Sequence, residues 1–458
     1  MGLFANISEK VERSISKKFK AALDTGDGDS ALLGLVGKLA TRPALARKIY
    51  GEGEVFLIKS ALFMSGVRLD ESAYEAVGTR WKEDLGQRHY DPDAGKPRTR
   101  AMPHGILMPH GFYMPLTISA ASPLTLRRDH GELCLYLDDF CLFPVAYEPR
   151  PSYYDRLTAS GVPMRHVGVH RLLRQVLVEY NAYCNFFSQK MPCLFCGIVS
   201  DRPLLSARHR GKFAATPGEI AEVVEAAYDE GVATEMQVTG GVLKDQAEVP
   251  YLLEVGRAMQ ARLGEQTIKG SQAVLAAPAD LVQVDALKEA GFEGVAFNLE
   301  IWNEALWPGI VPGKQHLLPR DGWLRALEHA VGVFGKGNVA SVLVAGIEPA
   351  RSYLEGVEWM AERGIHAVPI PWTPAPGSAF EGHQTPTAAW HLDLTVRVLE
   401  LWEKHGLSPE RHSAGGLHYA DLGRMRAHLR REAAESANGE MPKDLRHSLA
   451  IEGKLPAL

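Results

Sequence analysis

From about residue 170 onward, the chain alternates between short apolar runs and stretches with apolar residues at helical spacing. The runs are short, continuous and rich in β-branched residues, which predicts buried strands rather than half-exposed ones. Their helical partners include 323–334 and 353–363. The predicted strands lie at 176–180, 235–239, 267–275, 294–299, 339–345 and 366–371.

One helix in this series carries a clear start signal. Thr216 can cap the helix, Pro217 suits the first turn, and Glu219 completes a capping box. Ile220, Val223, Val224 and Ala227 then recur at helical spacing up to Gly231, where the helix is expected to stop.

Six strands that are each followed by a helix predict a parallel sheet with helical crossovers. We expect an α/β fold, a partial (β/α)6 barrel spanning residues 166–400. A mixed α/β accessory region is predicted at 1–165 and a helical extension at 401–458. Within the accessory region, 133–145 is rich in strand formers and the polar stretch 91–100 is expected to be a loop. In barrels of this kind the chemistry lies at the carboxyl ends of the strands.

Composition narrows the class of protein. Hydrophobic residues make up 46% of the 458 residues and the formal net charge is −5, so no bulk field favours nucleic acid or anionic lipid. No run reaches the roughly 18 apolar residues of a spanning helix, and the first 23 residues lack the apolar stretch of a signal peptide. We therefore expect a cytoplasmic protein that binds neither membrane nor nucleic acid.

Three of the five cysteines lie close together, as Cys184, Cys193 and Cys196. In a reducing compartment such clustering indicates metal or redox chemistry. A structural zinc site or an iron–sulfur electron carrier normally needs four protein ligands, whereas three cysteines on a four-iron cluster leave one iron open. A zinc site and three buried cysteines without a metal remain alternatives. We interpret Cys134 and Cys141 as small buried apolar residues.

Three cysteines just after the first strand of a (β/α) barrel, with Phe195 directly before the last of them, resemble the radical S-adenosylmethionine superfamily. The usual spacing in that superfamily is three residues and then two, whereas this chain has eight and then two. Later strand ends resemble its biotin-synthase-like branch, and the resemblance covers roughly residues 170–400.

The resemblance implies a set of cofactor contacts. Gly240 and Gly241 would meet the amino group of the methionine moiety, although Val242 stands where many members carry Glu. Asn298 and Glu300 point the same way in an extended chain, so both would face the nucleoside. Gly346 and Ile347 are weaker candidates for packing against the adenine, and Phe195 is a weaker candidate beside the cluster.

The function implied by the resemblance is reductive cleavage of S-adenosylmethionine by a [4Fe-4S] cluster, giving a 5′-deoxyadenosyl radical that takes hydrogen from a small organic substrate. A one-electron donor such as flavodoxin or ferredoxin would be the redox partner. Two other functions stay open, a non-catalytic iron–sulfur protein and a zinc-stabilised (β/α) hydrolase. No residue is assigned to catalysis on the substrate, and the charged run 424–435 is interpreted as a solvated helix face.

Overall fold

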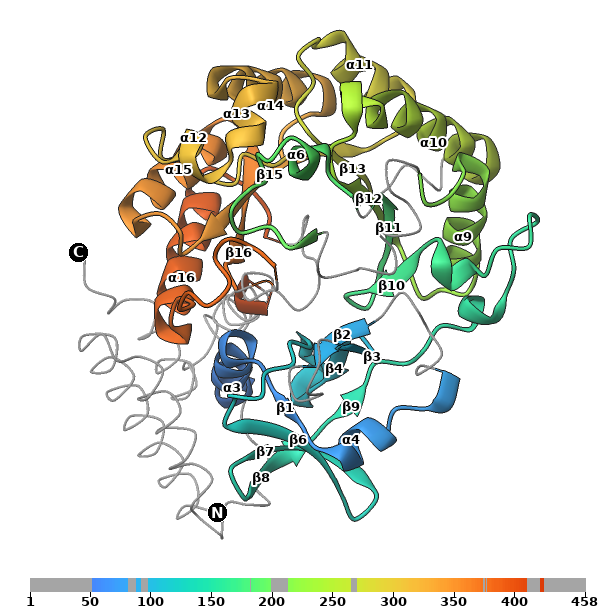
Figure 1. The fold of residues 1–458 in the computed structure, drawn as a ribbon, viewed down its shortest axis with the longest axis vertical. Helices are drawn as coiled ribbons and strands as arrows, with labels where there is room; N and C mark the ends of the chain where they lie inside the picture. The colour runs from blue at the N-terminus through green and yellow to red at the C-terminus, as the bar shows by residue number, and fades with distance from the viewer. Residues whose placement is uncertain are drawn as a thin grey trace, which may run out of the picture.

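A computed structural model describes residues 52–80, 88–91, 98–181, 183–198, 213–264, 270–373, 375, 377–409 and 421–423. Its main feature is a seven-stranded sheet that curls into an arc with helices along the convex side (Figure 1). The strand order follows the sequence from β10 to β16. These strands are β10 (Val169–Arg171), β11 (Gln175–Asn181), β12 (Glu235–Gly240), β13 (Ser271–Leu275), β14 (Gly294–Phe297), β15 (Val339–Ala345) and β16 (Ile365–Pro371).

Strands β11 to β16 are parallel and confirm the predicted half-barrel, while β10 pairs antiparallel with β11 and was not predicted. The first residues of the third predicted strand, 267–269, lie outside the described residues. The helical segments in this part of the chain are α6 (Asn185–Ser188), α9 (Pro217–Asp229), η5 (Lys244–Gln246), α10 (Glu248–Leu263), α11 (Val282–Glu289), α12 (Trp307–Ile310), α13 (Pro312–Leu317), α14 (Arg320–Phe334), α15 (Ala350–Glu362) and α16 (Ala388–Lys404).

The start of α9 shows how local sequence fixes an element. The Thr216 side chain accepts from the backbone of Glu219 and the Glu219 side chain accepts from the backbone of Thr216, so the predicted capping box is confirmed. Gly231 follows with φ +74°, a left-handed conformation that favours glycine and ends the helix. The face that α9 turns inward is apolar and fully buried against β11.

In the N-terminal region, the described residues form small sheets and short helical segments. One sheet contains β1 (Arg68–Leu69), β6 (Leu124–Asp129), β7 (Glu132–Leu137) and β8 (Phe140–Pro144); another contains β4 (Gly105–Leu107), β5 (Tyr113–Pro115) and β9 (Ala146–Tyr147); β2 (Arg88–Asp91) pairs with β3 (Arg98–Ala101). The helical segments are α3 (Glu52–Ser65), α4 (Glu71–Glu75), η2 (Pro109–Gly111), η3 (Ser152–Asp155) and η4 (Met164–His166).

Two sequence interpretations in this region need correction. Both ends of the predicted loop 91–100 are strand, because Asp91 pairs with Arg98 in the β2–β3 ladder; residues 92–97 lie outside the described part. The strand-forming stretch 133–145 is a hairpin, and only Cys134 of its two cysteines is buried. Cys141 is exposed because it lies on β8 at the edge of its sheet, so its interpretation as a buried apolar residue is wrong.

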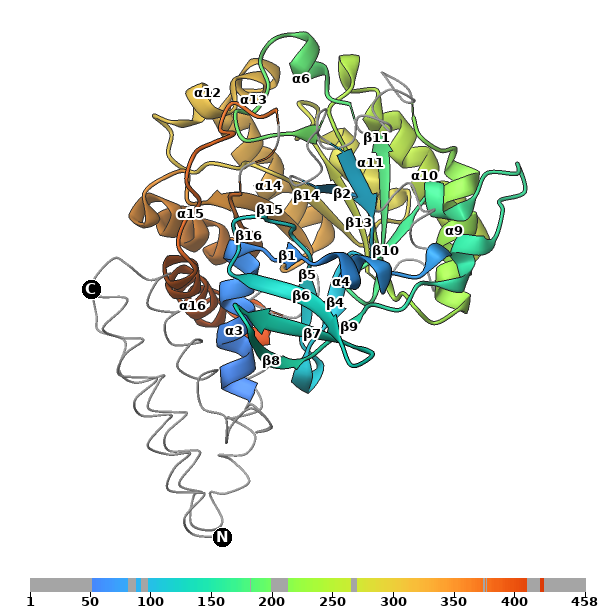
Figure 2. The same cartoon turned by 60° about the horizontal axis from the view of Figure 1, so that its bottom comes forward.

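The N-terminal region and the end of the barrel are packed together. Helix α3 contacts α16, and the buried ammonium of Lys59 on α3 pairs with Asp421 (Figure 2). Helix α16 runs across residue 400, and the charged run 424–435 lies outside the described residues. No helix in the described ranges is long and apolar enough to cross a membrane.

Candidate metal centre

The three clustered cysteines lie on one loop, residues 184–197, which we call the cysteine loop. It begins at the carboxyl end of β11, where Cys184 is buried and occupies the N-cap position of α6. Cys193 and Cys196 are joined by a tight turn, since the Cys196 amide donates to the Cys193 carbonyl at 3.0 Å. The structure therefore places all three cysteines at the predicted rim of the half-barrel.

Backbone hydrogen bonds connect the cysteine loop to segments that follow three other strands. The Asn185 amide donates to Val242 after β12, at 2.7 Å. The Leu194 amide donates to Ile310 of α12 at 2.9 Å, and the Leu194 carbonyl accepts from Phe380 after β16 at 3.3 Å. Figure 2 shows α6 beside α12 and α13 at this rim. These hydrogen bonds connect the cysteine loop to the segments that follow β12, β14 and β16.

Gly240 and Gly241 lie where other parts of the chain come very close to the backbone, and their predicted contact with a cofactor stays a prediction. A Cβ on Gly241 would lie 2.2 Å from the Tyr183 carbonyl and 2.7 Å from the Cβ of Cys184, and a Cβ on Gly240 would meet the Tyr180 ring at 2.5 Å. The space beside Gly241 is thus filled by the cysteine loop itself. Glycine is required here so that two backbones can approach closely.

The charges around the thiols come mainly from one ion pair. Lys314 of α13 and Glu300 lie 2.9 Å apart with side chains only 11% and 13% exposed. Burial raises the pKa of the Cys193 thiol, and the Lys314 ammonium opposes that rise. Glu300, Cys196 and Cys184 push the same pKa upward, which shows that the three thiols and the ion pair share one electrostatic environment.

Lys314 is the functional candidate that the sequence analysis missed. Its ammonium donates to the Asn298 carbonyl and to Glu300, and it lies 4.7 Å from the centre of the Trp323 ring. The whole residue is 8% exposed, and lysine is rarely buried to this extent unless its charge is paired. The residue lies 14 positions after Glu300 in a short helix, and no motif marked it. The burial of Lys314 near the thiols results from the packing of α13 against the cysteine loop, so it becomes visible only in the three-dimensional structure.

Asn298 and Glu300 follow β14 as predicted, but they are not alternating positions of an extended strand. Glu300 has φ +72°, a left-handed conformation, and its backbone pairs with β15 instead. The Asn298 side chain accepts from the Val342 amide at 3.1 Å, so it holds β15. Burial raises the pKa of Glu300, and the Lys314 ammonium opposes this rise. Glu300 is therefore a buried, paired carboxylate rather than a solvated loop residue.

The remaining predicted contacts also lie at the rim. Gly346 has φ +102°, and a Cβ there would lie 2.1 Å from Pro386, so its free side is covered by the segment before α16. Ile347 and Phe195 are half-buried and pack against the core. No contact described for these three residues tests their predicted roles toward a cofactor.

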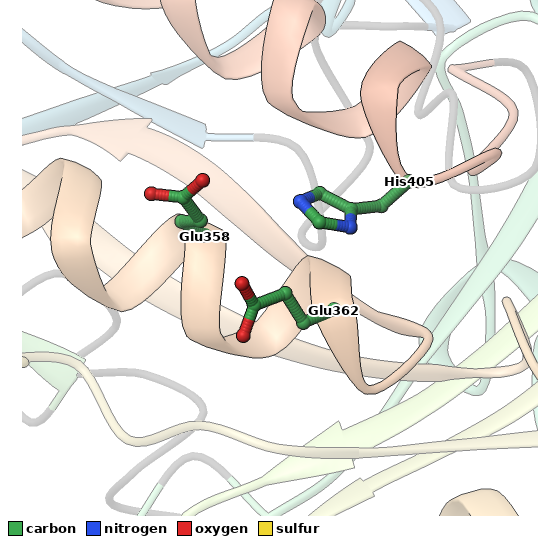
Figure 3. Close-up of side chains that lie close together, drawn as sticks. All are labelled: Glu358, Glu362 and His405. Carbon is green, nitrogen blue, oxygen red and sulfur yellow. The ribbon is translucent and has the colours of Figure 1, made fainter.

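A second group of potential metal ligands lies elsewhere in the fold. Within the described part of the chain, Glu358, Glu362 and His405 bring three ligand atoms within 4.8 Å of one another (Figure 3).

The group in Figure 3 is unrelated to the cysteine loop. Glu358 and Glu362 lie one turn apart on α15, just before β16 begins, and hence at the opposite end of the barrel strands. Glu358 already pairs with Lys404 at 2.5 Å, and that contact lowers the pKa of Glu358. The Lys404 ammonium therefore already compensates the charge of Glu358, and a metal ion is not needed for that purpose.

Comparison with known proteins gives one curated relative. It is named bacteriochlorophyllide c C-7(1)-hydroxylase, from Chlorobaculum limnaeum, and it is 26% identical over 239 residues. The match covers 50% of this chain and 60% of the relative. The resemblance to the radical S-adenosylmethionine superfamily is confirmed. No protein-family model matches the sequence.

Solved structures of radical S-adenosylmethionine proteins are also similar. Methylornithine synthase (PylB) has a TM-score of 0.40 and 17% identity, covering 56% of this chain and 70% of that one. A radical SAM methyltransferase from Sphaerobacter thermophilus has a TM-score of 0.39 and 18% identity, covering 62% and 76% respectively.

Proposed function

We propose that this protein is a radical S-adenosylmethionine enzyme whose [4Fe-4S] cluster is held by Cys184, Cys193 and Cys196. The observation that carries the proposal is the cysteine loop itself. It presents three thiols at the carboxyl rim of a parallel half-barrel, in one electrostatic environment with a buried lysine. Three thiolates leave one iron without a protein ligand, where a small molecule can bind.

The residues present fit such a cluster. Thiolates are the ligands that iron–sulfur clusters bind, and three of them leave one iron of a four-iron cluster without a protein ligand. None of the five cysteines forms a disulfide. On the same loop, Phe186 is buried and Phe195 packs against the hydrophobic core. The loop is also braced by Gly241, whose missing side chain lets Cys184 sit close to β12.

When bound, the reduced cluster supplies one electron that cleaves S-adenosylmethionine to methionine and a 5′-deoxyadenosyl radical. The chain would position the reactants for this step and exclude water. Lys314 offers a buried cation beside the thiols, suited to an anionic group of the cofactor. Glu300 is the nearby carboxylate, suited to ribose hydroxyls, and Lys314 holds it in place.

The substrate and the electron donor belong to the same proposal. The relative's name specifies a bacteriochlorophyllide, so an apolar organic substrate is the class we favour for this chain. We propose a flavodoxin or ferredoxin type of protein as the one-electron donor. A reducing compartment such as the cytoplasm would suit both the cluster and the five free cysteines.

The decisive experiment is anaerobic reconstitution of the full chain with iron and sulfide, followed by reductant and S-adenosylmethionine. We expect a brown protein that releases 5′-deoxyadenosine. Replacing Cys184, Cys193 or Cys196 by Ala should each remove most of the iron and the cleavage activity.

Cys134→Ser serves as the matched control, because that buried cysteine lies in the N-terminal sheet and should leave the iron content intact. A colourless protein that binds zinc through these cysteines would refute the proposal. A brown protein that never cleaves S-adenosylmethionine would favour an electron carrier instead.

A further inference from the structure

Two cysteines outside the cysteine loop lie on neighbouring strands of the N-terminal sheet. Cys134 belongs to β7 and Cys141 to β8, and neither takes part in the proposed function. The two strands form a hairpin, so only six residues separate the cysteines along the chain. Cys134 is 5% exposed, whereas Cys141 is exposed to solvent. The hairpin therefore carries one buried thiol and one accessible thiol.

The strand register places both cysteines on one face of the sheet. Tyr136 pairs directly with Cys141, and Cys134 lies two residues before Tyr136 on the same strand. Side chains of residues that pair across a ladder point to the same face, and so do side chains two residues apart on one strand. Cys134 and Cys141 are therefore diagonal neighbours on that face.

The ladder between β7 and β8 is irregular beside the two thiols. Tyr136 pairs with Cys141, but the preceding residue, Leu135, pairs with Phe143. Leu142 is thus an extra residue on β8, and such a bulge bends and twists the strand that carries it. Among the described strands, β8 pairs with β7 alone. An edge strand with a bulge can make the small shift that a bond between diagonal neighbours requires.

The surroundings of Cys134 keep its thiol protonated. Burial, and then the Cys141 thiol, raise the pKa of Cys134 to about 12. Two nearby carboxylates, Glu132 and Asp129, add to this rise. An influence of Cys141 on this pKa requires the two sulfur atoms to be near each other. The thiolate is the form that reacts with oxidants, so we expect the accessible Cys141 to react before Cys134.

We propose that Cys134 and Cys141 form a redox-active dithiol, which hydroperoxides convert to a disulfide within the hairpin. The Cys141 thiolate attacks the O–O bond of the hydroperoxide and becomes a sulfenic acid, and the other oxygen leaves as hydroxide or alkoxide. The Cys134 sulfur then attacks the sulfenic sulfur. The S–O bond breaks, and the hydroxyl group leaves as water with the proton of the Cys134 thiol. Two thiols are oxidised and one hydroperoxide is reduced.

The disulfide is reversible in a reducing compartment. A small thiol such as glutathione attacks the accessible Cys141 sulfur, and a second thiol completes the exchange and restores both cysteines. Disulfides in such compartments are usually transient, which fits a pair that responds to oxidants rather than a permanent crosslink. The inference is independent of the proposed function, because it uses no residue of the cysteine loop.

The test is thiol mapping of the full chain by mass spectrometry. The protein is treated with hydrogen peroxide, its free thiols are blocked with iodoacetamide, and it is digested with trypsin. No lysine or arginine lies between residues 129 and 149, so both cysteines stay in one peptide, separate from the cysteine loop. We expect this peptide to carry no blocking group and to be two hydrogens lighter than its reduced form. Dithiothreitol added before blocking should restore two blocking groups.

Single variants test the order of the two steps. Cys134→Ser, or Cys134→Ala if the serine variant does not fold, should accumulate a sulfenic acid on Cys141 that dimedone traps. Cys141→Ser should leave the buried Cys134 largely unoxidised. Cys184→Ala is the matched control and should form the hairpin disulfide like the wild type.

Three results would overturn the inference: oxygen added to Cys141 of the wild type without a disulfide in the hairpin peptide, a disulfide between two copies of the chain, or no reaction at either cysteine. Iron content and cleavage of S-adenosylmethionine are measured on untreated samples of the same protein. If the wild type lacks both while the hairpin disulfide forms, the proposed function fails and the dithiol remains.

Discussion

The ion pair between Lys314 and Glu300 makes a quantitative prediction. We consider Lys314→Met, which keeps the length of the side chain and removes its charge. Breaking a buried ion pair by removing one partner costs about 3–5 kcal/mol, and slight exposure places this pair at the lower end. We therefore expect Lys314→Met to lower the free energy of unfolding by about 3 kcal/mol near pH 8.

The loss of unfolding free energy in Lys314→Met should grow as the pH rises. Burial raises the pKa of Glu300 already in the wild type, and the loss of the opposing ammonium raises it further. A carboxyl with a raised folded pKa contributes stability that is fully present below its unfolded pKa, about 4.3, and that is lost as the pH rises through the folded value. Lys314→Met should therefore be least destabilised near pH 5 and most destabilised near pH 8.

A double variant isolates the charge. Lys314→Met and Glu300→Gln together remove both charges, so most of the lost stability near pH 8 should return and the pH dependence should flatten. The contact of Lys314 with the Trp323 ring, 4.7 Å away, is lost in single and double variants alike and cancels in their difference. Urea unfolding of cluster-free protein at several pH values measures all three. Equal stability of the single and double variants at every pH would refute the reasoning.

Three further outcomes follow from named contacts. Gly241→Val should lower iron content and cofactor affinity together, because its side chain would collide with the cysteine loop, whereas Gly218→Ala has open space and should change neither. Iron retained by a folded Gly241→Val would contradict this. Glu300→Gln should weaken S-adenosylmethionine binding about tenfold while sparing the cluster, since it loses charge-assisted hydrogen bonds; unchanged affinity would place the nucleoside elsewhere. Burial raises the pKa of Glu148 to about 7, so the free energy of unfolding should fall as the pH rises from about 4.5 through 7. Thermal unfolding measured across this pH range should show a smaller fall for Glu148→Gln than for the wild type. An equal fall in both proteins would show that other groups cause it.

The barrel was predictable because its strands carry their signal locally. Strand β15 is a continuous apolar run that is buried almost throughout, whereas β12 and β13 alternate between buried and half-buried residues, and each predicted run ended near the residue where the structure ends the strand. The capping box at Thr216 is a purely local device, and it formed as predicted. The short antiparallel β10 was missed because three residues are too few to show a pattern.

The sequence was least informative where long-range contacts decide the arrangement. Sequence alone could not show that Tyr183 and Cys184 would lie in the space where a Cβ on Gly241 would stand. Lys314 was missed because its partners come from a different element. The hairpin at Cys141 could have been found, since the adjacent Asp138 and Asp139 interrupt the apolar run, and Asp138 adopts φ +52°.

The structure also accounts for the long gap between the first two cysteines. The extra residues form α6, which buries Phe186 to 4% exposure and turns the chain back at Lys190, where φ is +56°. Gly313 lies against this turn, since a Cβ there would meet the Phe186 ring at 2.4 Å, and its amide donates to Met191 at 3.1 Å. Gly313 directly precedes Lys314 in α13. The longer gap therefore provides the contact surface that fixes α13 beside the thiols, so the unusual spacing and the buried lysine are two parts of one arrangement.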